Sequence, residues 1–362
     1  MNELFQTRIL TILAVVLVAM LFNSCQKEYT ITVVANNANL GMVSGGGVYK
    51  KGGFVELVAK PAGNCHFEKW DDGNTDNPRT ITINGNITYT AVFAIENNFS
   101  ISETKKVLFS PGNLQWSASG SHVVAGGRTA AGTWRFAPNQ LDTIGIGNNN
   151  ISSTYTGWID LFGCGTSGYD NKYPYMTSTT NSDYVNKEDD ITGTYYDWGG
   201  YNAIYNPHTN TTDAPGTWRT LTKNEWDYLL NTRNTASNIR FARGIVCGIA
   251  GVIIVRDDWD PSIYSLNDVN TIEGITSYTS NIIDASDWAK MEAAGCVFLP
   301  TAGYREETSV SEVGSYGFYW SSTCHYYYSA FSMYFNSSNI HIPCGSLFRY
   351  YGNSVRLVKD VK

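Results

Sequence analysis

Basic clusters, paired cysteines and long apolar runs are scarce in this sequence, and each absence excludes a class of protein. The net charge is −7 and the longest positive runs are pairs such as Lys50-Lys51, whereas nucleic-acid binding needs a concentrated basic patch. We therefore expect no nucleic-acid partner. The six cysteines after Cys25 form no CxxC pair and have no regular spacing, so neither a disulfide framework nor a zinc site is indicated.

Signatures of catalysis and of bound cofactors are absent as well. The sequence contains no P-loop and no dinucleotide fingerprint, and its histidines show neither the i,i+4 zinc spacing nor an obvious nucleophile partner. Asp257-Asp258-Trp259-Asp260 groups three carboxylates, but Pro261 follows and no glycine-containing calcium loop surrounds them. We expect no catalytic residue, no metal and no cofactor, and hence not an enzyme.

Aromatic residues and glycine, by contrast, are abundant. The chain has 10 Trp, 24 Tyr and 34 Gly, and 43% of it is hydrophobic, which is typical of folded, aromatic-rich β structure rather than disorder. Its 362 residues leave room for two or three domains. The expected fold class is α+β and β-rich.

The N-terminus indicates export. Arg8 precedes an apolar run from Ile9 to Phe22, which is too short for a comfortable membrane span but suits the apolar region of a signal peptide. Ser24 before Cys25 resembles a bacterial lipoprotein cleavage site. The resemblance implies a signal peptide over 1–24, lipidation of Cys25, a tether over 25–28 and a lipid-anchored, surface-exposed location at the bacterial outer membrane. A plain signal peptide with an incidental cysteine is the alternative.

Residues 29–95 carry strand patterns separated by turn residues. Period-two alternation predicts strands at Tyr29–Val33, Phe54–Val58, Thr80–Ile83 and Tyr89–Phe93. Together with the spacing of Phe67, Trp70 and Gly73, this order of strands resembles the divergent internalin-type B repeat, a small all-β domain of secreted and surface proteins. The single copy suggests a spacer.

From residue 96 to 362 we expect one large domain with few helices. Thr222 and Glu225 form a capping box, in which the hydroxyl and the carboxylate bind free backbone N–H groups at a helix start. The helix that they open would bury Trp226, Leu229 and Leu230.

A second helix and a strand are expected later in this domain. The helix starts near Asp284 or Ser286 and ends at Gly295. The apolar run Cys296–Pro300 that follows indicates a buried strand.

Short motifs spread over this domain resemble a known fold. Trp218–Trp226 resembles the Arg-Leu-Pro-Thr-x-x-Glu-Trp signature of formylglycine-generating-enzyme-type C-type lectin folds, although Thr220 intervenes after Arg219 and the proline is missing. Further landmarks follow in the family's order: Trp134–Phe136, Gly157–Gly163, Tyr196–Gly199, Tyr319–Ser322 and Ser354–Val358. The resemblance implies a C-type lectin-like domain over 96–362. Large aromatic side chains gain most from burial, so we expect the core of this domain to contain Trp134, Trp158, Trp198, Trp226 and Trp320.

The segment 324–351 has an unusual composition. It holds six of the 24 tyrosines, including the run Tyr326-Tyr327-Tyr328, and Arg349 is its only Lys, Arg, Asp or Glu. Such aromatic runs cannot all point inward from strands, and exposed apolar patches usually mark interaction sites. A surface rich in Tyr, Ser, Asn and Gly is also how antibody paratopes gain contact area at low entropic cost. An ordinary aromatic-rich strand-loop-strand is the alternative.

This segment is similar to the variable region of proteins diversified by retroelements, in which template adenines are copied unfaithfully. In that family Lys, Glu, Gln, Met and Trp do not arise at varied positions. Met333 is the only such residue in the window, so it should be fixed and pack inward. Phe335, Asn336, Ile340, Arg349 and Arg356 are assigned to the scaffold.

The resemblance implies a set of varied, solvent-facing residues that contact the ligand, although Phe331 could belong to the core instead. These residues are Cys324, His325, Tyr326, Tyr327, Tyr328, Phe331, Ser332, Tyr334, His341, Gly345, Ser346, Leu347, Phe348, Tyr350 and Tyr351.

The leading hypothesis is therefore a surface lipoprotein that displays a diversified face to a protein or glycan ligand at a cell or phage surface. One alternative is a fixed-specificity adhesin or carbohydrate-binding module, although the Glu-Pro-Asn and Gln-Pro-Asp tripeptides of calcium-dependent lectins are missing. Another is an oxidase of the formylglycine-generating type, whose close cysteine pair would have to be Cys324 and Cys344. These two cysteines could also pair as a disulfide.

Overall fold

The computed structural model describes residues 27–38, 40–61, 65–95, 98–185, 190–274 and 277–361, without the side chains of 94–95 and 343–346. The chain divides into two compact units, residues 1–94 and 95–362. The signal peptide expected at 1–24 and the lipidation site Cys25 lie outside the described residues. Within the described ranges, none of the helices has the length and apolar character to cross a bilayer.

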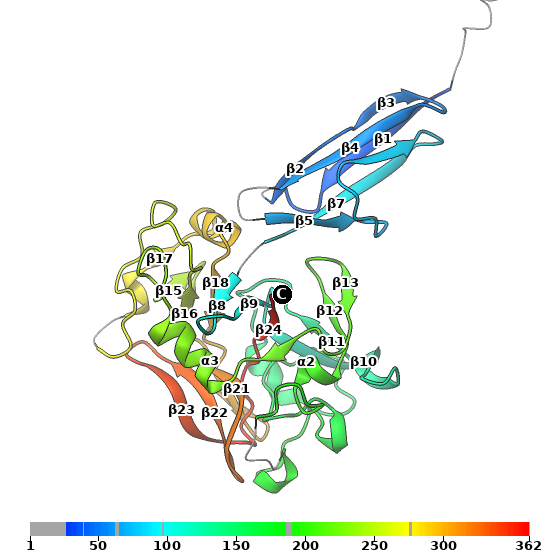
Figure 1. Ribbon diagram of the computed structural model, residues 1–362. Helices are drawn as coiled ribbons and strands as arrows, with labels where there is room; N and C mark the ends of the chain where they lie inside the picture. The colour runs from blue at the N-terminus through cyan, green and yellow to red at the C-terminus, as the bar shows by residue number, and fades with distance from the viewer. Residues whose placement is uncertain are drawn as a thin grey trace, which may run out of the picture. The chain divides into compact units, whose positions relative to one another are not determined.

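The first unit consists of two sheets (Figure 1). The four-stranded sheet has the order β3-β1-β7-β5, with β1 and β7 parallel, and the three-stranded sheet has the order β2-β4-β6. Their bounds are β1 Glu28–Ala35, β2 Gly41–Ser44, β3 Gly47–Lys50, β4 Phe54–Pro61, β5 Cys65–Trp70, β6 Arg79–Thr82 and β7 Ile87–Ile95. All four predicted strands are confirmed. The sequence patterns did not predict β2, β3 and β5.

Trp70 organises the core of this unit. Its side chain is fully buried, its Nε1 donates a hydrogen bond to the carbonyl of Asp76 at 2.9 Å, and its ring packs 5.3 Å from that of Phe67. Gly41 is required beside this core, because a Cβ there would lie 2.5 Å from the ring of Phe93. The Phe67–Trp70 spacing noted in the sequence is therefore a packing contact.

The second unit is β-rich, with strands in several small sheets. The sheet orders are β10-β11-β12-β13, β14-β24-β9-β8, β17-β15-β16-β18, β19-β20 and β21-β22-β23. The strands are β8 Asn98–Ser100, β9 Lys106–Phe109, β10 Leu114–Val123, β11 Thr129–Phe136, β12 Ile204–Asn206, β13 Thr211–Asp213, β14 Arg219–Thr220, β15 Phe241–Val246, β16 Ile249–Ile254, β17 Ile282–Ile283, β18 Val297–Pro300, β19 Tyr304–Glu306, β20 Ser309–Ser311, β21 Gly317–Tyr326, β22 Ser329–Phe335, β23 Ile340–Phe348 and β24 Leu357–Asp360.

Helices in this unit are short. They are the 3₁₀ segments Gly145–Asn150, Tyr169–Asn171, Asn181–Asp183 and Tyr278–Ser280, the α-helices α2 Trp198–Tyr201, α3 Lys223–Asp227 and α4 Ala285–Ala293, and a π-helical turn at Tyr228–Thr232 that continues α3. The capping box that opens α3 is present. Asp284 caps α4, and β18 is fully buried, so these three predictions are confirmed.

The predicted aromatic core is mostly present. Trp134, Trp198, Trp226 and Trp320 are buried, whereas Trp158 is only partly buried and its ring lies 3.7 Å from the guanidinium of Arg135. The core assignment of Trp158 is therefore wrong, because a cation–π contact holds it near the surface.

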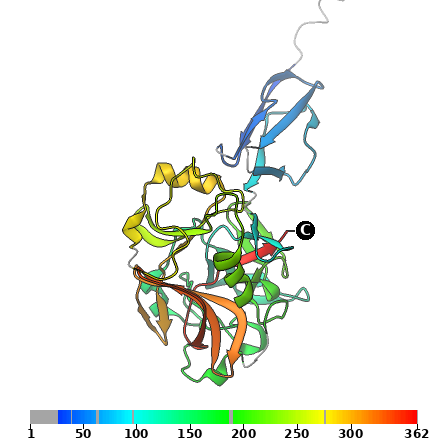
Figure 2. The same cartoon turned by 60° about the vertical axis from the view of Figure 1, so that its left-hand side comes forward.

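The sheet β21-β22-β23 carries most of the segment 324–351 (Figure 2). Its inner face contributes Tyr319, Met333, Phe335 and Ile340 to an apolar cluster that also includes Trp226 of α3. Met333 is fully buried, as its inward packing was predicted. On the opposite face, Phe318 and Tyr334 are only partly buried, whereas Trp320 and Ser332 are buried.

Candidate ligand-binding surface

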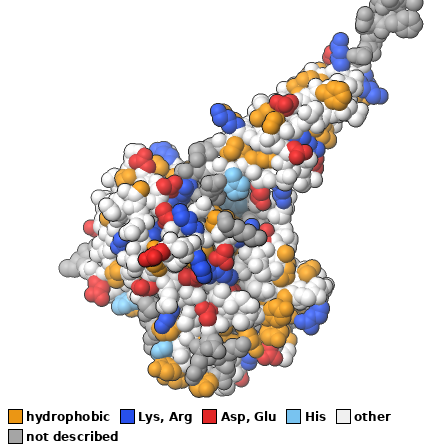
Figure 3. Space-filling view, viewed as in Figure 1, with side chains coloured by type: hydrophobic (Ala, Val, Ile, Leu, Met, Phe, Trp, Pro, Cys, Tyr) orange, Lys and Arg blue, Asp and Glu red, His pale blue; other side chains and the backbone are white. Residues whose placement is uncertain are grey.

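Three tyrosines form the tip of the β21–β22 hairpin. Tyr326 ends β21 and Tyr327 and Tyr328 form the connecting turn. Their side chains are 51%, 61% and 50% exposed, and the rings of Tyr326 and Tyr328 stack with centroids 5.9 Å apart. The expected exposure of this run, called here the tyrosine turn, is what the structure shows. In Figure 3, hydrophobic side chains gather at the end of the second unit where this hairpin ends in Figure 1.

Arg349 holds the tyrosine turn from below. Its side chain is fully buried, and its guanidinium donates to the carbonyls of Tyr326 and of Ser329, the latter at 3.2 Å. Its backbone N–H donates to the carbonyl of Tyr328 and to Oδ1 of Asn181 at 3.0 Å. One scaffold residue thus fixes the backbone of the turn while the tyrosine rings remain in solvent.

A ladder of rings continues from strand to strand across the outer side of the sheet. Tyr316 and Phe318 have centroids 5.8 Å apart, Phe318 and Tyr334 5.4 Å, and Tyr334 and His341 4.5 Å. The three pairs are stacked, with interplanar angles of 8°, 23° and 16°. Tyr334 and His341 meet because their strands pair directly at these residues.

Tyr304 links this ladder to the C-terminal aromatic run. Its ring lies 5.4 Å from that of Phe318 and 5.4 Å from that of Tyr351. Tyr351 packs on Tyr350 at 5.0 Å, and Tyr350 stacks on Phe348 at 5.3 Å. We call the whole set the aromatic face; it consists of Tyr304, Tyr316, Phe318, Tyr326, Tyr327, Tyr328, Tyr334, His341, Phe348, Tyr350 and Tyr351.

Three members of the aromatic face, Tyr304, Tyr316 and Phe318, lie outside the predicted window. Phe318 joins it because β21 pairs with β22 so that Phe318 is opposite Tyr334. Two-residue alternation around the buried Tyr319 could have placed Phe318 on the outer face. Tyr304 and Tyr316 carry no comparable signal in the sequence.

Two of the predicted contact residues do not face solvent. Cys324 is 3% exposed and Ser332 is 1% exposed, so their assignment as solvent-facing contacts is wrong. Both lie in the central part of the hairpin, where the sheet is covered on both sides. Leu347 is partly buried and packs against the core, which also removes most of it from the surface.

The remaining predicted residues are partly exposed, or their side chains are outside the described part of the structure. The Phe331 ring is partly buried, with the Lys223 ammonium 4.4 Å from its centroid and the His325 ring at 4.7 Å. His325 Nδ1 lies 3.2 Å from the Ser329 hydroxyl. Gly345 and Ser346 belong to β23, but their side chains are outside the described part of the structure. The scaffold assignments of Phe335, Ile340, Arg349 and Arg356 agree with the complete burial of these residues, and Asn336 is partly buried.

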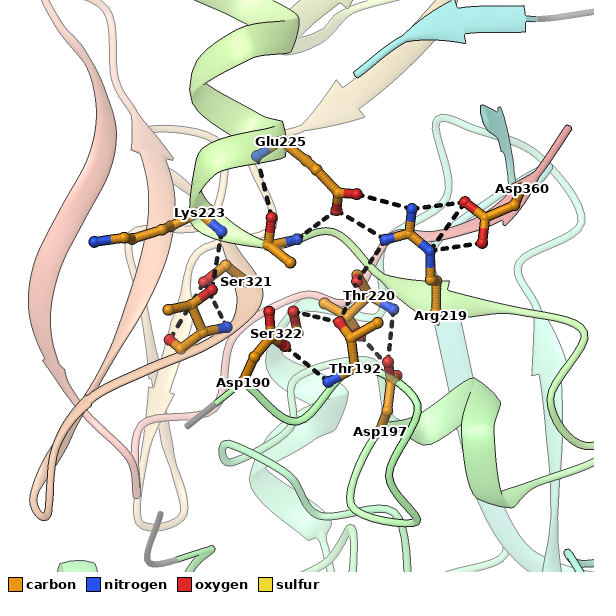
Figure 4. A network of polar contacts seen from close by, with 12 residues as sticks. Asp190, Thr192, Asp197, Arg219, Thr220, Lys223, Glu225, Ser321, Ser322 and Asp360 are labelled. Carbon is orange, nitrogen blue, oxygen red and sulfur yellow. Dashed lines mark hydrogen bonds and ion pairs between the residues drawn. The ribbon is translucent and has the colours of Figure 1, made fainter. Parts of the chain in front are cut away.

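A second surface feature is a polar cleft of about 770 Å³ beside the C-terminal strand, lined by Thr192, Trp218, Arg219, Glu225 and Asp360 among others. Figure 4 shows the Arg219 guanidinium between two carboxylates. Its Nη1 and Nη2 donate to Glu225 at 2.8 and 2.9 Å, and its Nε and Nη2 donate to Asp360 at 3.0 and 2.7 Å. Burial alone would lower the pKa of this guanidinium, but the bonds to Asp360 and Glu225 raise it.

Asp197 lies fully buried beneath this cleft. It accepts hydrogen bonds from the backbone N–H and the hydroxyl of Thr220, each at 2.9 Å. Burial nevertheless raises the pKa of Asp197 to about 6. Arg219, Glu225 and Asp360 in this cleft therefore already bind one another. Such an arrangement indicates a structural role for these charged groups.

The described residues offer no group of three or more His, Cys, Asp or Glu side chains that could hold a metal ion. Asp257 forms ion pairs with Arg233 and Lys106, and Asp258 pairs with Arg256. Two of the carboxylates that cluster in the sequence thus have separate cationic partners.

Of the two cysteines expected to form a pair, Cys324 lies in β21, and the side chain of Cys344 is outside the described part of the structure. Cys324 is buried and belongs to one apolar cluster with Cys164. Its burial leaves Cys324 unsuited to the accessible cysteine pair that an oxidase would need.

Comparison with known protein families identifies the first unit. Residues 29–97 match the divergent InlB B-repeat domain. The N-terminal unit is a B repeat. Residues 260–358 match a domain family of unknown function, DUF8237; this range begins before β17, ends within β24 and includes the whole aromatic face. No curated protein and no solved structure shows significant similarity to the chain.

Proposed function

We propose that this protein is a surface-anchored lipoprotein whose second unit, a C-type lectin-like domain, presents the aromatic face to a protein or glycan ligand. The exposure of the tyrosine turn carries the proposal, since each of its three side chains is at least half exposed. Water-exposed tyrosines arranged side by side offer large contact area with little conformational entropy to lose. No catalysis and no cofactor are involved.

The residues that support the aromatic face would allow its outward side chains to be substituted. Arg349 binds backbone carbonyls rather than tyrosine side chains, so the turn keeps its backbone whatever residues occupy it. Met333, Phe335 and Ile340 anchor the sheet from the inner side. This division between outward rings and inward anchors supports the proposal of retroelement-type diversification.

The lectin-type fold is part of the same proposal. Its support is the set of landmark motifs, because Trp134, Trp198, Trp226 and Trp320 are buried within one domain, and the capping box of the Trp218–Trp226 motif opens α3. The B repeat would act as a spacer between the lipid on Cys25 and this domain at the bacterial outer membrane. Mass spectrometry of the mature N-terminal peptide tests the anchor: a diacylated Cys25 supports it, and an unmodified or absent Cys25 contradicts it.

Sequencing this gene from many cells of one population tests diversification. We expect substitutions at codons for outward residues, such as Tyr326–Tyr328, Tyr334 and Tyr350. Codons for Met333, Phe335 and Arg349 should stay constant, and a near-copy of the 3′ end differing only at adenines should lie beside a reverse transcriptase. Identical codons in all cells with no such copy would contradict it.

A fixed carbohydrate-binding site is the second candidate. Against it stands the stacking within the ladder, because rings at interplanar angles of 8°, 23° and 16° cover one another's faces, whereas a sugar ring stacks on a free face. Purified protein applied to a glycan array distinguishes the two: the same glycan bound by several natural variants would favour the fixed site.

A further inference from the structure

Exposed acidic side chains lie beside the aromatic face. Between residues 300 and 351 the sequence contains two basic residues, Arg305 and Arg349, and three acidic residues, Glu306, Glu307 and Glu312. Both arginines are fully buried, at 0% exposure, whereas all three glutamates are exposed. The formal charges that this segment presents to solvent are therefore all negative. We call Glu306, Glu307 and Glu312 the acidic border.

The acidic border belongs to the β19–β20 hairpin, which is fixed against the C-terminal aromatic run. The Arg305 N–H donates to the carbonyl of Gly352 at 2.8 Å, and the Gly352 N–H donates to that of Arg305 at 2.7 Å. Because this bridge is antiparallel, Glu306 becomes the neighbour of Tyr351 across it. Burial and the carboxylate of Glu306 both raise the pKa of the Tyr351 hydroxyl. The border therefore adjoins the rings of the face.

The other two glutamates also lie close to members of the aromatic face. Burial raises the pKa of the Tyr350 hydroxyl, and the nearby carboxylates of Glu306 and Glu307 add to that rise. The carbonyl of Glu312 accepts a hydrogen bond from the Tyr316 N–H at 3.0 Å, at the end of the ring ladder. Each residue of the border thus adjoins a segment that carries a ring of the face.

The charge of the acidic border is not neutralised by the described residues. Arg305 is next to it in the sequence, but its guanidinium donates to the backbone carbonyls of Glu307 and Leu161. No ion pair or side-chain hydrogen bond within the described ranges engages the three carboxylates, whereas Asp258 and Asp287 elsewhere on this unit each have a cationic partner. The border therefore retains its capacity to pair with a partner molecule.

We propose that the aromatic face binds a protein surface rich in lysine and arginine. Ring faces attract the cations of these side chains, and opposite charges at the rim of an interface speed association and select the partner. The same sheet already shows one such contact, since the Lys223 ammonium lies 4.4 Å from the centroid of the Phe331 ring. This inference rests on the proposed function and adds the chemistry of the ligand.

Charge complementarity also separates this partner from other occupants of the face. A second copy of the chain would bring its own acidic border, and like charges placed opposite each other weaken binding. Glycans that carry carboxylate or sulfate groups would be repelled in the same way. The border lies outside the segment 324–351, so the preference for a basic partner would persist even if that segment varies.

Selection from a random peptide library displayed on phage tests the ligand class. The full chain, purified in detergent, is immobilised, and its recovered peptides are compared with those of the variant Tyr326→Ala/Tyr327→Ala/Tyr328→Ala. We expect Lys and Arg to be enriched about threefold over the starting library, with Asp and Glu depleted. Recovered peptides without this bias would overturn the inference but leave the proposed function standing.

Two further outcomes of the selection are informative. Binding to a glycan array, with no peptide recovered above the tyrosine variant, would also overturn the inference while leaving the proposed function standing. Equal behaviour of wild type and the tyrosine variant on both peptides and glycans would contradict the proposed function itself.

A charge-matched pair of variants tests the acidic border. The most enriched peptide serves as the probe, and its Kd is measured by fluorescence anisotropy at low salt. We expect Glu306→Gln/Glu307→Gln/Glu312→Gln to weaken binding about tenfold. The control Glu56→Gln/Glu68→Gln/Glu103→Gln removes three exposed charges from other segments and should change the Kd less than about twofold. Equal weakening by both variants would show attraction to the net charge of −7 alone and would overturn the inference.

Discussion

The aromatic face and the Arg219 cleft are both on the surface of the second unit, but their side chains are used differently. In the cleft, Arg219 makes hydrogen bonds to Glu225 and Asp360 with all three of its guanidinium nitrogens. On the aromatic face, the tyrosine turn leaves half or more of each ring in water. Groups that satisfy one another have little binding capacity left for a partner, whereas exposed apolar area gains free energy when a partner covers it.

The comparison also separates stability from recognition. The cleft joins α3, β14 and β24 through charge-assisted bonds, so its residues should matter for folding. The core under the aromatic face does not need the exposed rings, because Met333 and Arg349 are fully buried on the inner side of the face. Substitutions should therefore affect stability in the cleft and binding at the face.

The largest effect is expected from Arg219→Ala. Its removal leaves the Glu225 and Asp360 carboxylates near each other without their shared cation, and breaking a largely buried ion pair costs about 3 kcal/mol. Denaturant unfolding followed by tryptophan fluorescence measures this loss. Lys290→Ala, which breaks the exposed pair with Asp287, is the control and should leave unfolding unchanged. Equal behaviour of the two variants would refute the structural role of the cleft.

A pH-dependent effect is expected from Asp197→Asn. The folded-state pKa of Asp197 is raised to about 6, so the stability that this group contributes is present below its ordinary value near 3.8 and is lost as pH rises through 6. The asparagine variant does not titrate, and its free energy of unfolding relative to wild type should rise by about 2 kcal/mol between pH 4 and pH 7.

Unfolding curves at several pH values measure that difference. Thr220→Val is the matched control, because it removes a hydrogen-bond donor to Asp197 but keeps the titrating carboxyl. The control should retain a fall in stability with rising pH. A constant difference between wild type and Asp197→Asn over this range would contradict the assignment.

A smaller effect is expected from Thr222→Ala. The Thr222 hydroxyl accepts a hydrogen bond from the Glu225 N–H at 3.2 Å at the start of α3, and loss of such a cap costs about 1 kcal/mol. Thr222→Ser keeps the acceptor and should restore most of the stability in the same denaturation assay. A serine variant as unstable as the alanine variant would show that the cap is not the cause.

The smallest effect on stability is expected at the face itself. Replacing Tyr326, Tyr327 and Tyr328 together by alanine should change the free energy of unfolding by no more than about 0.5 kcal/mol, because exposed side chains contribute little to folding. Met333→Ala, on the buried side of the same sheet, should cost about 3 kcal/mol. A large loss in the triple variant would mean that the tyrosines support the hairpin rather than the surface.

Sequence patterns predicted the helices and strands that depend on interactions between residues close together in the chain. The capping box found α3 because its two partners are three positions apart, and period-two alternation found four strands of the B repeat. Met333 was assigned inward correctly. Cys324 and Ser332 were assigned outward wrongly, since nothing in their own sequence neighbourhood shows that loops and a second core cluster cover that part of the hairpin.

Contacts between distant segments could not be predicted. Asp360 reaches Arg219 from 141 positions away, and Tyr304 joins the aromatic face because its ring packs against those of Phe318 and Tyr351. Cys324 shares an apolar cluster with Cys164, which comes from a distant part of the chain. Spacing along the chain carries no information about which loop packs on which strand.

The sequence by itself determined the B repeat, the β-rich character, the helix starts and the exposure of the tyrosine turn, because these follow from periodicity, capping and the inability of consecutive rings to point inward together. The tertiary structure alone decided how far the aromatic face extends and which charged groups neutralise one another. Those features arise where segments far apart in the chain pack together, and packing depends on the shape of the whole domain.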